Sequence, residues 1–245
     1  MKQVIFDFCE FPGWSRFGGF LESFVLASPG FEVLDLGGGA NPRLQQAVLQ
    51  RIGYDLLDVD GDELSKASLI HGRKICIDAT ASADTFLAEI GDKRYDLVFS
   101  HMFLEHIQDP DQLHRNVFSA LKAGGRAVHA YPCRHNIPLA MNATLPETIT
   151  RVMLQFSRPG RDLDGKQRKF PAYYRKCYPP SSQSLTYFES LGYQVESHKG
   201  FAGHLYYQRL PVVRELEQIH RKFVIATQLP WVCFSLLVLR KPDYC

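Results

Sequence analysis

Residues 33–42 read VLDLGGGANP, and they carry the strongest fold signal in the chain. An apolar run that contains Asp35 leads into three glycines. Glycine lets the backbone approach a ligand closely, and a helix that starts after such a turn offers unpaired N–H groups. Asn41 and Pro42 are typical of a helix cap and a first helical position, so we expect a helix that ends before Gly53. The stretch predicts a strand–turn–helix unit that can hold a nucleotide-like cofactor.

Two common nucleotide motifs are excluded at this turn. A dinucleotide fingerprint that starts at Gly37 requires a glycine at position 42, which is proline here. A P-loop requires Gly-Lys followed by Ser or Thr, which the chain lacks. A strand–helix turn without a ligand remains the alternative interpretation.

Short apolar runs alternate with helical patterns around this turn. Such alternation predicts an α/β fold with a parallel sheet and helices on both faces. Asp109-Pro110 predicts a helix start, and Gly124-Gly125 predicts its end. The expected strands of this half are EVLDL (32–36), YDLLDV (54–59), KICID (74–78), YDLVFS (95–100) and RAVHAY (126–131).

The second half of the chain resumes this pattern after an interruption that is rich in proline, aromatic and basic residues. We interpret the interruption as a cap on the carboxyl side of the sheet. A helix and a strand are expected in SLTYFESLGYQVESH (184–198), a helix from Pro211 to about Gln228, and the last strand in WVCFSLLVLRK (231–241). We expect a single domain over 1–245, with a cofactor-binding core at about 31–131, the cap at about 132–180 and the last elements at about 181–245.

The composition predicts a globular, cytoplasmic protein. Hydrophobic residues make up 45% of the chain and charged residues 22%, and the formal net charge of +2 does not indicate a nucleic-acid partner. The six cysteines show no zinc-ligand spacing, so we expect reduced thiols and no metal. The N-terminus lacks a secretory pattern, and the longest apolar run is roughly half a membrane span, so no integral membrane segment is expected.

Acidic residues at the ends of the next two strands extend the predicted cofactor site. Asp58 closes the second strand, where a carboxylate can accept hydrogen bonds from both hydroxyls of a ribose. Asp60 is an alternative for this role, and it can equally be a solvated turn residue. Asp78 follows the third strand, placed to meet an adenine amino group, while the small Ala79 leaves room for the ring.

The segment after the fourth strand adds a family resemblance. It reads YDLVFSHMFLEHIQDP (95–110) and is followed by LKAGGRAVHAYP (121–132). With these motifs, residues 33 to about 131 resemble class I S-adenosylmethionine-dependent methyltransferases, in particular the small-molecule branch related to ubiquinone and menaquinone C-methyltransferases. In that branch the turn reads D-x-G-x-G-x-G, and E-H-[IV]-x-D-P leads to L-K-x-G-G. Asn41 departs from the pattern, since many relatives have a third glycine there.

The resemblance implies a Rossmann-like, doubly wound sheet of seven strands with an antiparallel last strand, and a cap after the fifth. It also implies S-adenosylmethionine as the cofactor. By this likeness the glycine turn surrounds the methionine part, while Asp58 holds the ribose and Asp78 the adenine. The expected cofactor-binding residues are Asp35, Gly37, Gly38, Gly39, Asp58, Val59, Asp78, Ala79 and Ser100.

His101 is the first candidate for a general base, because it follows the fourth strand and an imidazole titrates near neutrality. The alternative is that it only lines the pocket. His204 is a second catalytic candidate, whereas His106 is expected in a structural hydrogen-bond network and His129 in the core. The expected substrate-binding residues are His101, Tyr131, Arg134, His135, Tyr173 and Tyr174.

Together these patterns predict methyl transfer to an O, N or C nucleophile of a small-molecule acceptor, such as a secondary metabolite or a sugar or polysaccharide precursor. The alternatives are a non-catalytic protein that keeps the fold for binding or scaffolding, and an S-adenosylmethionine-dependent enzyme with other chemistry. Residues 100–103 lack the N/D-P-P-Y/F motif common in amino-methylating nucleic-acid enzymes. One face of the last helix carries Val213, Leu216, Ile219 and Phe223, which indicates internal packing or a homodimer contact rather than a membrane surface.

Overall fold

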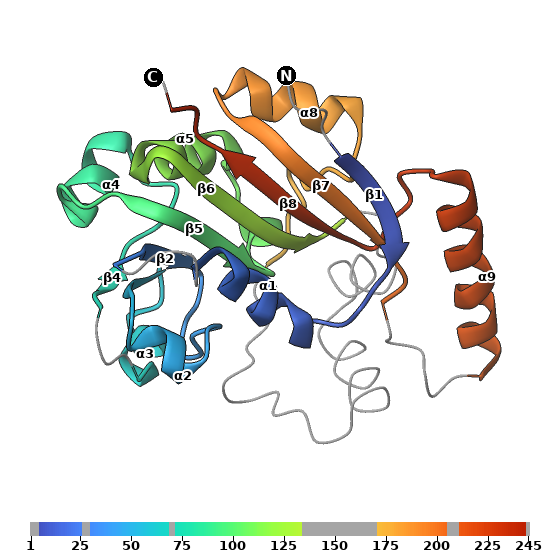
Figure 1. The fold of residues 1–245 in the computed structure, drawn as a ribbon, viewed down its shortest axis with the longest axis horizontal. Helices are drawn as coiled ribbons and strands as arrows, with labels where there is room; N and C mark the ends of the chain where they lie inside the picture. Colours follow the sequence, from blue (N-terminus) through green and yellow to red (C-terminus); the bar gives the residue numbers. More distant parts are fainter. Residues whose placement is uncertain (1–4, 26–29, 69–71, 134–170, 205–210, 244–245) are drawn as a thin grey trace.

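The computed structural model describes residues 5–25, 30–68, 72–133, 171–204 and 211–243, and an eight-stranded sheet runs through them (Figure 1). The strand order is β1-β7-β8-β6-β5-β2-β3-β4. Within this sheet β8 is antiparallel to both of its neighbours, and the other five pairings are parallel. The expected α/β fold with an antiparallel last strand is confirmed. The strands are β1 Ile5–Glu10, β2 Glu32–Leu36, β3 Gly53–Asp58, β4 Lys74–Cys76, β5 Tyr95–His101, β6 Leu121–Pro132, β7 Gln194–Ala202 and β8 Phe234–Arg240.

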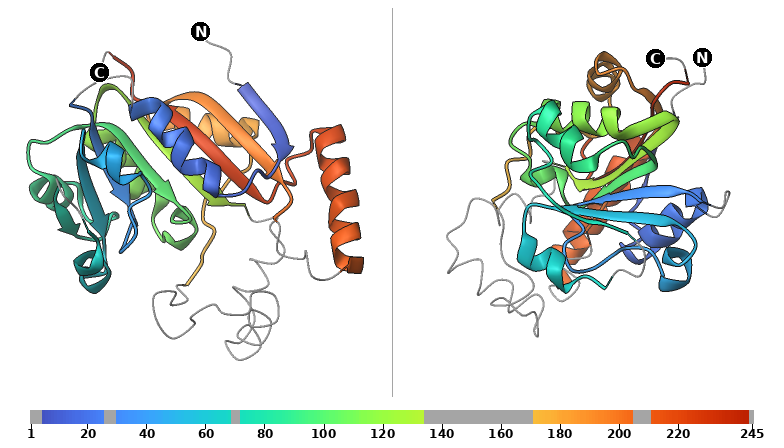
Figure 2. Two further views of the ribbon diagram at one scale, coloured as in Figure 1. Left: turned by 60° about the horizontal axis from the view of Figure 1, so that its bottom comes forward. Right: turned by 90° about the vertical axis from the view of Figure 1, so that its left-hand side faces the viewer.

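Helices cover both faces of the sheet (Figures 1 and 2). Phe86, Val117 and Phe188 bury α4, α5 and α8 against one face, and Leu21 buries α1 against the other. Coverage of both faces explains why the inner strands read as continuous apolar runs. The helices are α1 Ser15–Val25, α2 Gln46–Leu49, α3 Gly61–Lys66, α4 Ala83–Ile90, the 3₁₀ turn η1 Leu104–His106, α5 Pro110–Ala120, α8 Ser182–Ser190 and α9 Pro211–Thr227. None of these described helices is long and apolar enough to cross a membrane.

Strand β1 was not expected from the sequence, so the sheet has eight strands rather than seven. It lies at the edge, parallel to β7, with Ile5 opposite Ser197 and Glu10 opposite Ala202. The acids Asp7 and Glu10 interrupt its apolar residues, and charged residues are common on edge strands. Because β1 runs parallel to the central strands, it delivers the following residues to their carboxyl edge.

Helix α2 begins later than expected. The predicted cap was Asn41 with Pro42 in the first turn, but the helix starts at Gln46. The backbone N–H of Asn41 donates to the carbonyl of Gly38 at 3.2 Å, so the chain is still completing the glycine turn at this point. The prediction of a cap at Asn41 was therefore wrong.

Helix α5 begins where the sequence predicted and ends earlier. The carboxylate of Asp109 accepts the N–H of Gln112 at 3.0 Å, and Pro110 occupies the first turn. The helix ends at Ala120, and Gly124 and Gly125 lie inside β6 rather than ending the helix. Their backbone groups pair with Lys241 at 3.1 and 2.9 Å, so the glycines serve the strand contact with the segment after β8.

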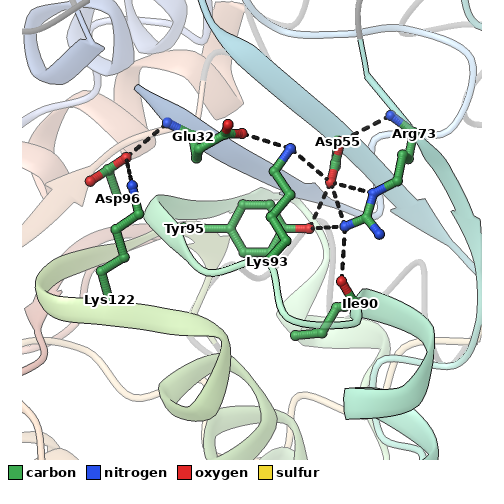
Figure 3. Close-up of polar contacts among 8 residues, drawn as sticks. All are labelled: Glu32, Asp55, Arg73, Ile90, Lys93, Tyr95, Asp96 and Lys122. Carbon is green, nitrogen blue, oxygen red and sulfur yellow. Dashed lines mark hydrogen bonds and ion pairs between the residues drawn. The ribbon is translucent and has the colours of Figure 1, made fainter. Parts of the chain in front are cut away.

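A polar cluster closes the amino edge of the sheet, opposite the carboxyl edge (Figure 3). The carboxylate of Asp55 is fully buried and accepts hydrogen bonds from Arg73 at 2.8–3.0 Å and from the Tyr95 hydroxyl at 2.8 Å. Lys93 Nζ lies 3.1 Å away. Burial alone would raise the pKa of Asp55, but these partners outweigh it and lower the pKa. The cluster joins β3, β5 and the loops beside them.

We expect Asp55→Asn to lower the free energy of unfolding by about 2–3 kcal/mol, because it leaves buried donors facing a neutral group. The matched control is Asp96→Asn, which removes the more exposed ion pair of Asp96 with Lys122 and should cost about 1 kcal/mol or less. Urea denaturation of both variants at neutral pH tests this. Equal losses for the two variants would contradict the structural role given to Asp55.

Candidate active site

The carboxyl ends of β2 and β5 lie where the strand order reverses. From β2 the chain continues to β3 and β4 on one side and then crosses to β5 on the other. Ligands of open α/β sheets gather at such a point. Leu36 pairs with Ser100, so Gly37 and His101 follow at the same level on neighbouring strands. The glycine turn and His101, the candidate general base, therefore lie side by side.

The glycine turn packs too closely for side chains at its first two positions. Gly37 and Gly39 have φ angles of 69° and 51°. This left-handed region favours glycine. A Cβ atom on Gly37 would lie 2.3 Å from the Phe103 ring, and one on Gly38 would lie 2.6 Å from Asp35 Oδ2. The sequence interpretation of these glycines thus has a steric basis in the fold.

The structure separates the roles of Asp58 and Asp60. Asp60 caps α3, since its carboxylate accepts the N–H groups of Asp62 and Glu63 at 3.0 and 3.1 Å. Asp58 lies at the end of β3 and accepts the N–H groups of Gly39 at 3.1 Å and Asp60 at 3.0 Å, one on each oxygen. Burial raises the pKa of Asp58 above its ordinary value, against the effect of these bonds. Each oxygen keeps acceptor capacity for a further donor.

Asp35 lies below the turn and is buried. Its carboxylate accepts the hydroxyl hydrogen of Tyr54 on the neighbouring strand β3. Burial raises the pKa of Asp35 to about 7, although the Tyr54 hydrogen bond and the positive charge of Arg43 oppose the shift. Tyr54 was not identified from the sequence, because only the β2–β3 register brings its ring to this acid.

The residues expected at the adenine and methyl positions differ in exposure. Val59 is 67% exposed beside Asp58, and Asp78 is exposed with Oδ1 bound to the N–H of Thr80 at 2.7 Å. Ala79 is buried. The side chain of Ser100 is also fully buried, and its hydroxyl bonds His129 Nδ1 at 2.8 Å. The structure therefore does not support a side-chain contact of Ser100 with a cofactor, because this hydroxyl points into the core.

His101 lies in an aromatic surround at the end of β5. Its ring centroid is 4.6 Å from that of Trp14 and 5.3 Å from that of Phe17. Both imidazole nitrogens are buried and have no hydrogen-bond partner among the described residues. Burial, with a smaller effect of Arg43, lowers the pKa of His101 to about 3, so the ring is neutral at physiological pH.

The backbone after His101 makes a sharp turn. Met102 adopts a φ of 53°, which costs a side-chain-bearing residue about 1–2 kcal/mol. Its N–H is held by the carbonyl of Ala130 at 2.8 Å. The turn brings the Phe103 ring against Gly37, so the segments that follow β5 and β2 are in contact here. Such strain is common where a side chain must be held in one position for function.

The aromatic rings around His101 come from the segment that follows β1, which contains Trp14 and Phe17. The indole of Trp14 also contacts Phe11 and Phe234, with centroids 4.8 and 4.7 Å away. Sequence analysis missed this contribution because β1 itself was not recognised. An aromatic cluster before the first glycine turn was the available signal, but its place depends on where the edge strand pairs.

Two further candidates, the expected substrate residue Tyr131 and the second catalytic candidate His204, are buried. Tyr131 is fully buried, and its hydroxyl lies 2.8 Å from the carbonyl of Tyr178 and 3.2 Å from His198 Nε2. We therefore remove Tyr131 from the substrate site, because core partners occupy its hydroxyl. His204 is buried at the end of β7 beside Glu217 and Arg221 of α9. Arg134 and His135, with most of the cap, lie outside the described residues.

The motif LEHIQDP anchors residues 171–174, where the described part of the chain resumes. The N–H groups of Tyr173 and Tyr174 donate to the carbonyl of Glu105 at 2.7 and 3.1 Å. His106 Nδ1 lies 2.7 Å from the carbonyl of Pro171, in line with the expected hydrogen-bond network. The carboxyl of Glu105 is buried, which raises its pKa to about 8. The motif thus holds residues 171–174 beside the end of β5.

A family model described as a methyltransferase domain matches residues 16–208. The chain belongs to this family. This class I methyltransferase family uses S-adenosylmethionine, so the expected family, enzyme class and cofactor are confirmed at that level. The match includes the glycine turn, Asp58, Asp78 and the whole of β5. A comparison with curated proteins gives no match.

Solved structures of low sequence identity share the fold. The [4+2]-cyclase SpnF has a TM-score of 0.55 at 15% sequence identity, over 93% of this chain and 81% of its own. An S-adenosylmethionine-dependent methyltransferase from Mesorhizobium loti has a TM-score of 0.53 at 18% identity over 94% and 99%. Phosphoethanolamine N-methyltransferase 2 from Haemonchus contortus has a TM-score of 0.54 at 17% sequence identity, over 95% of this chain and 54% of its own length. The chain spans about half of that enzyme.

The residues of this methyltransferase fit the cofactor of the family. The carboxylate of Asp58 can take ribose hydroxyls, the exposed Val59 offers an apolar surface to a base, and the turn at Gly37–Gly39 leaves backbone room. Asp78 is exposed at the end of the neighbouring strand. Among the described residues, no three His, Cys, Asp or Glu side chains gather in a group that could hold a metal ion.

Proposed function

We propose that this methyltransferase acts on an O, N or C nucleophile of a small-molecule acceptor, such as a secondary metabolite or a sugar or polysaccharide precursor. The observation that carries this proposal is His101. Its two nitrogens are buried without described partners, at the end of β5 and level with the glycine turn. A buried polar group without a partner costs free energy unless a ligand supplies one.

We propose that the neutral His101 accepts a hydrogen bond from the nucleophilic O–H or N–H of the acceptor and removes that proton as the new bond forms. The proton of an O–H nucleophile becomes far more acidic as the oxygen is methylated, so an imidazole of lowered basicity can take it. When bound, the cofactor supplies an activated methyl group on a sulfonium, so the protein mainly aligns the reactants and excludes water. Trp14 and Phe17 provide the apolar walls for this exclusion. Both nitrogens are covered in this structure, so the acceptor reaches them only after a neighbouring side chain moves.

The cofactor residues in this proposal are Asp58 for the ribose, Val59 and Ala79 for the adenine ring, and Asp78 for its amino group. Asp35 and the turn Gly37–Gly39 lie at the methionine part. Tyr173 is 41% exposed near the motif and remains a proposed acceptor contact together with Tyr174. We further propose the cytoplasm as the compartment and a non-nucleic-acid acceptor, supported by the net charge of +2 and by the free thiols of Cys9, Cys76, Cys133 and Cys177.

The cyclase SpnF shares this fold, so chemistry other than methyl transfer is the second candidate. The test is turnover of a small-molecule panel with S-adenosylmethionine, followed by mass spectrometry. Formation of S-adenosylhomocysteine with an equal amount of a product one methyl group heavier supports methyl transfer. An isomerised product without S-adenosylhomocysteine would replace the proposal with the second candidate. Cofactor binding without any turnover would favour the scaffold alternative.

We expect Asp58→Ala to weaken S-adenosylmethionine binding by about 1.5–3 kcal/mol, roughly 10- to 150-fold in Kd, because the charge-assisted ribose contacts are lost. Isothermal titration calorimetry measures the change. The control is Asp60→Ala, which removes the cap of α3 and should cost about 1 kcal/mol of stability with little loss of affinity. Similar affinities for the wild type and Asp58→Ala would refute the ribose assignment.

A further inference from the structure

The exposed apolar side chains of the described residues are concentrated at α9. Seven large hydrophobic side chains are exposed among the described residues. Four of them lie on α9, and a fifth, Trp231, follows the helix. On the helix they are Val212 at 74%, Leu216 at 62%, Ile219 at 65% and Phe223 at 46% exposure. The spacing of four, three and four residues places them on one face. A contiguous face of this kind marks an interaction site.

The opposite face of α9 fixes the helix to the body. Val224 is fully buried, and Arg221 lies 2.8 Å from Glu217 and 3.7 Å from Glu10 of β1. The carboxylate of Glu217 also accepts the backbone N–H of His204 at 3.2 Å. Figures 1 and 2 show α9 at one end of the molecule, beyond β1. The helix is therefore held in place with its apolar face turned away from the sheet.

The charges beside this face complement those of a second α9 in the antiparallel direction. Glu215 and Lys222 are seven residues apart, so both lie on the same flank of the apolar stripe. In an antiparallel pair, Glu215 of one helix meets Lys222 of the other, and the symmetry repeats the contact. Antiparallel pairing also places the positive end of each helix dipole beside the negative end of the other. In a parallel two-fold pair this flank of the two helices would lie on opposite sides of the seam, so Glu215 and Lys222 would not meet.

We propose that α9 pairs antiparallel with α9 of a second copy of this chain and forms a two-fold homodimer. The apolar seam consists of Val212, Leu216, Ile219 and Phe223, and Trp231 extends it through its contact with Phe223 at 6.2 Å between centroids. A lipid surface is the less suitable occupant, because such helices carry mainly basic polar faces. Here Arg214 contacts Oε1 of Glu215, which leaves Oε2 for Lys222 of the second copy, and Arg221 is paired with Glu217.

The pair buries a modest area. A helix of 17 residues is about 25 Å long, and one such contact stays below the roughly 1,200 Å² of a standard stable interface. We therefore expect a dissociation constant in the micromolar range. Sedimentation velocity across a concentration series, from well below to well above that range, should show reversible conversion of monomer to dimer. A monomer at every concentration would overturn the proposal.

The seam is tested by Leu216→Glu and Ile219→Glu, each of which should weaken dimerisation at least tenfold. Both side chains are exposed, so the variants should fold as the wild type does. The matched control is Gln183→Glu, which adds the same charge to an exposed position of α8, away from the seam, and should dimerise normally. Equal weakening by the control would overturn the assignment of the seam.

The orientation is tested by the flanking charges. Glu215→Lys and Lys222→Glu should each weaken self-association several-fold, because each creates like-charged contacts. A mixture of the two single variants should associate at least as well as the wild type, since both contacts become attractive in the mixed dimer. Failure of the mixture to recover would overturn antiparallel pairing. Flotation of the wild type with anionic phosphatidylglycerol vesicles, without self-association, would assign the face to a membrane instead.

Discussion

His101→Ala is expected to lower kcat by roughly 10²–10⁴-fold while the affinity for S-adenosylmethionine stays close to that of the wild type. The proton acceptor is lost, whereas the groups assigned to the cofactor, such as Asp58, lie on other strands. Because burial lowers the pKa of His101 to about 3, the imidazole is already neutral above pH 5. The wild type should therefore show no acidic limb from this group between pH 5 and 8.

His101→Gln separates proton removal from hydrogen bonding. Glutamine can accept a hydrogen bond from the acceptor but cannot take its proton, so this variant should be nearly as slow as His101→Ala. Steady-state kinetics of both variants, with calorimetric titration of the cofactor, provide the measurement. A glutamine variant that keeps most of its kcat would show that His101 positions the acceptor and that alignment alone accounts for the rate. A large loss of cofactor affinity in either variant would assign His101 to the cofactor instead.

The second large effect expected is a loss of stability in mild acid. Burial lowers the pKa of five imidazoles, those of His101 and His198 to about 3, those of His114 and His204 to about 4 and that of His129 well below its ordinary value. These rings stay neutral in the folded chain and take up protons on unfolding near the ordinary histidine pKa of about 6.5. Their contribution to stability is present above pH 6.5 and is lost as the pH falls below it.

Two buried carboxyls have the opposite effect on the pH dependence of stability, because they release protons on unfolding. The pKa of Asp35 is raised to about 7 and that of Glu105 to about 8, so both hold protons in the folded chain that they release on unfolding. Near pH 5.5 unfolding adds about five protons to these histidines and releases two from the carboxyls. The net uptake of about three protons corresponds to about 4 kcal/mol of stability lost per pH unit.

The same groups predict the position of the stability maximum. Above pH 7 the histidine contribution is constant, and the deprotonation of Asp35 and Glu105 destabilises the folded chain. The free energy of unfolding should therefore be highest between pH 6 and 7 and fall on both sides. Urea titrations from pH 4.5 to 8.5 measure the profile, and histidine NMR titrations identify the groups. A flat profile between pH 5 and 6.5 would contradict the neutral buried imidazoles.

The sequence alone was sufficient for the central strands and for the place of the glycine turn between β2 and the following helix. The run VLDLGGGANP, the acid at the end of each following strand and the motif LEHIQDP depend on local rules, namely periodicity, turn chemistry and the meeting of parallel strand ends at one edge. For this reason β2, β5 and the start of α5 agree with expectation. Local rules failed at α2, where the turn continues past Asn41 because Gly38 accepts its N–H.

The tertiary structure decided which of the candidate polar groups remain available for a ligand. The sequence could not separate Asp58 from Asp60, because the assignment depends on which carboxylate caps α3 and which meets Gly39. Likewise Tyr131 and Ser100 appeared suitable by position, but strand register turns their hydroxyls into the core, towards Tyr178 and His129. The aromatic walls of His101 depend on the pairing of β1 with β7, a contact between the two ends of the chain. Periodicity describes each segment alone, whereas burial and register arise only when distant segments pack together.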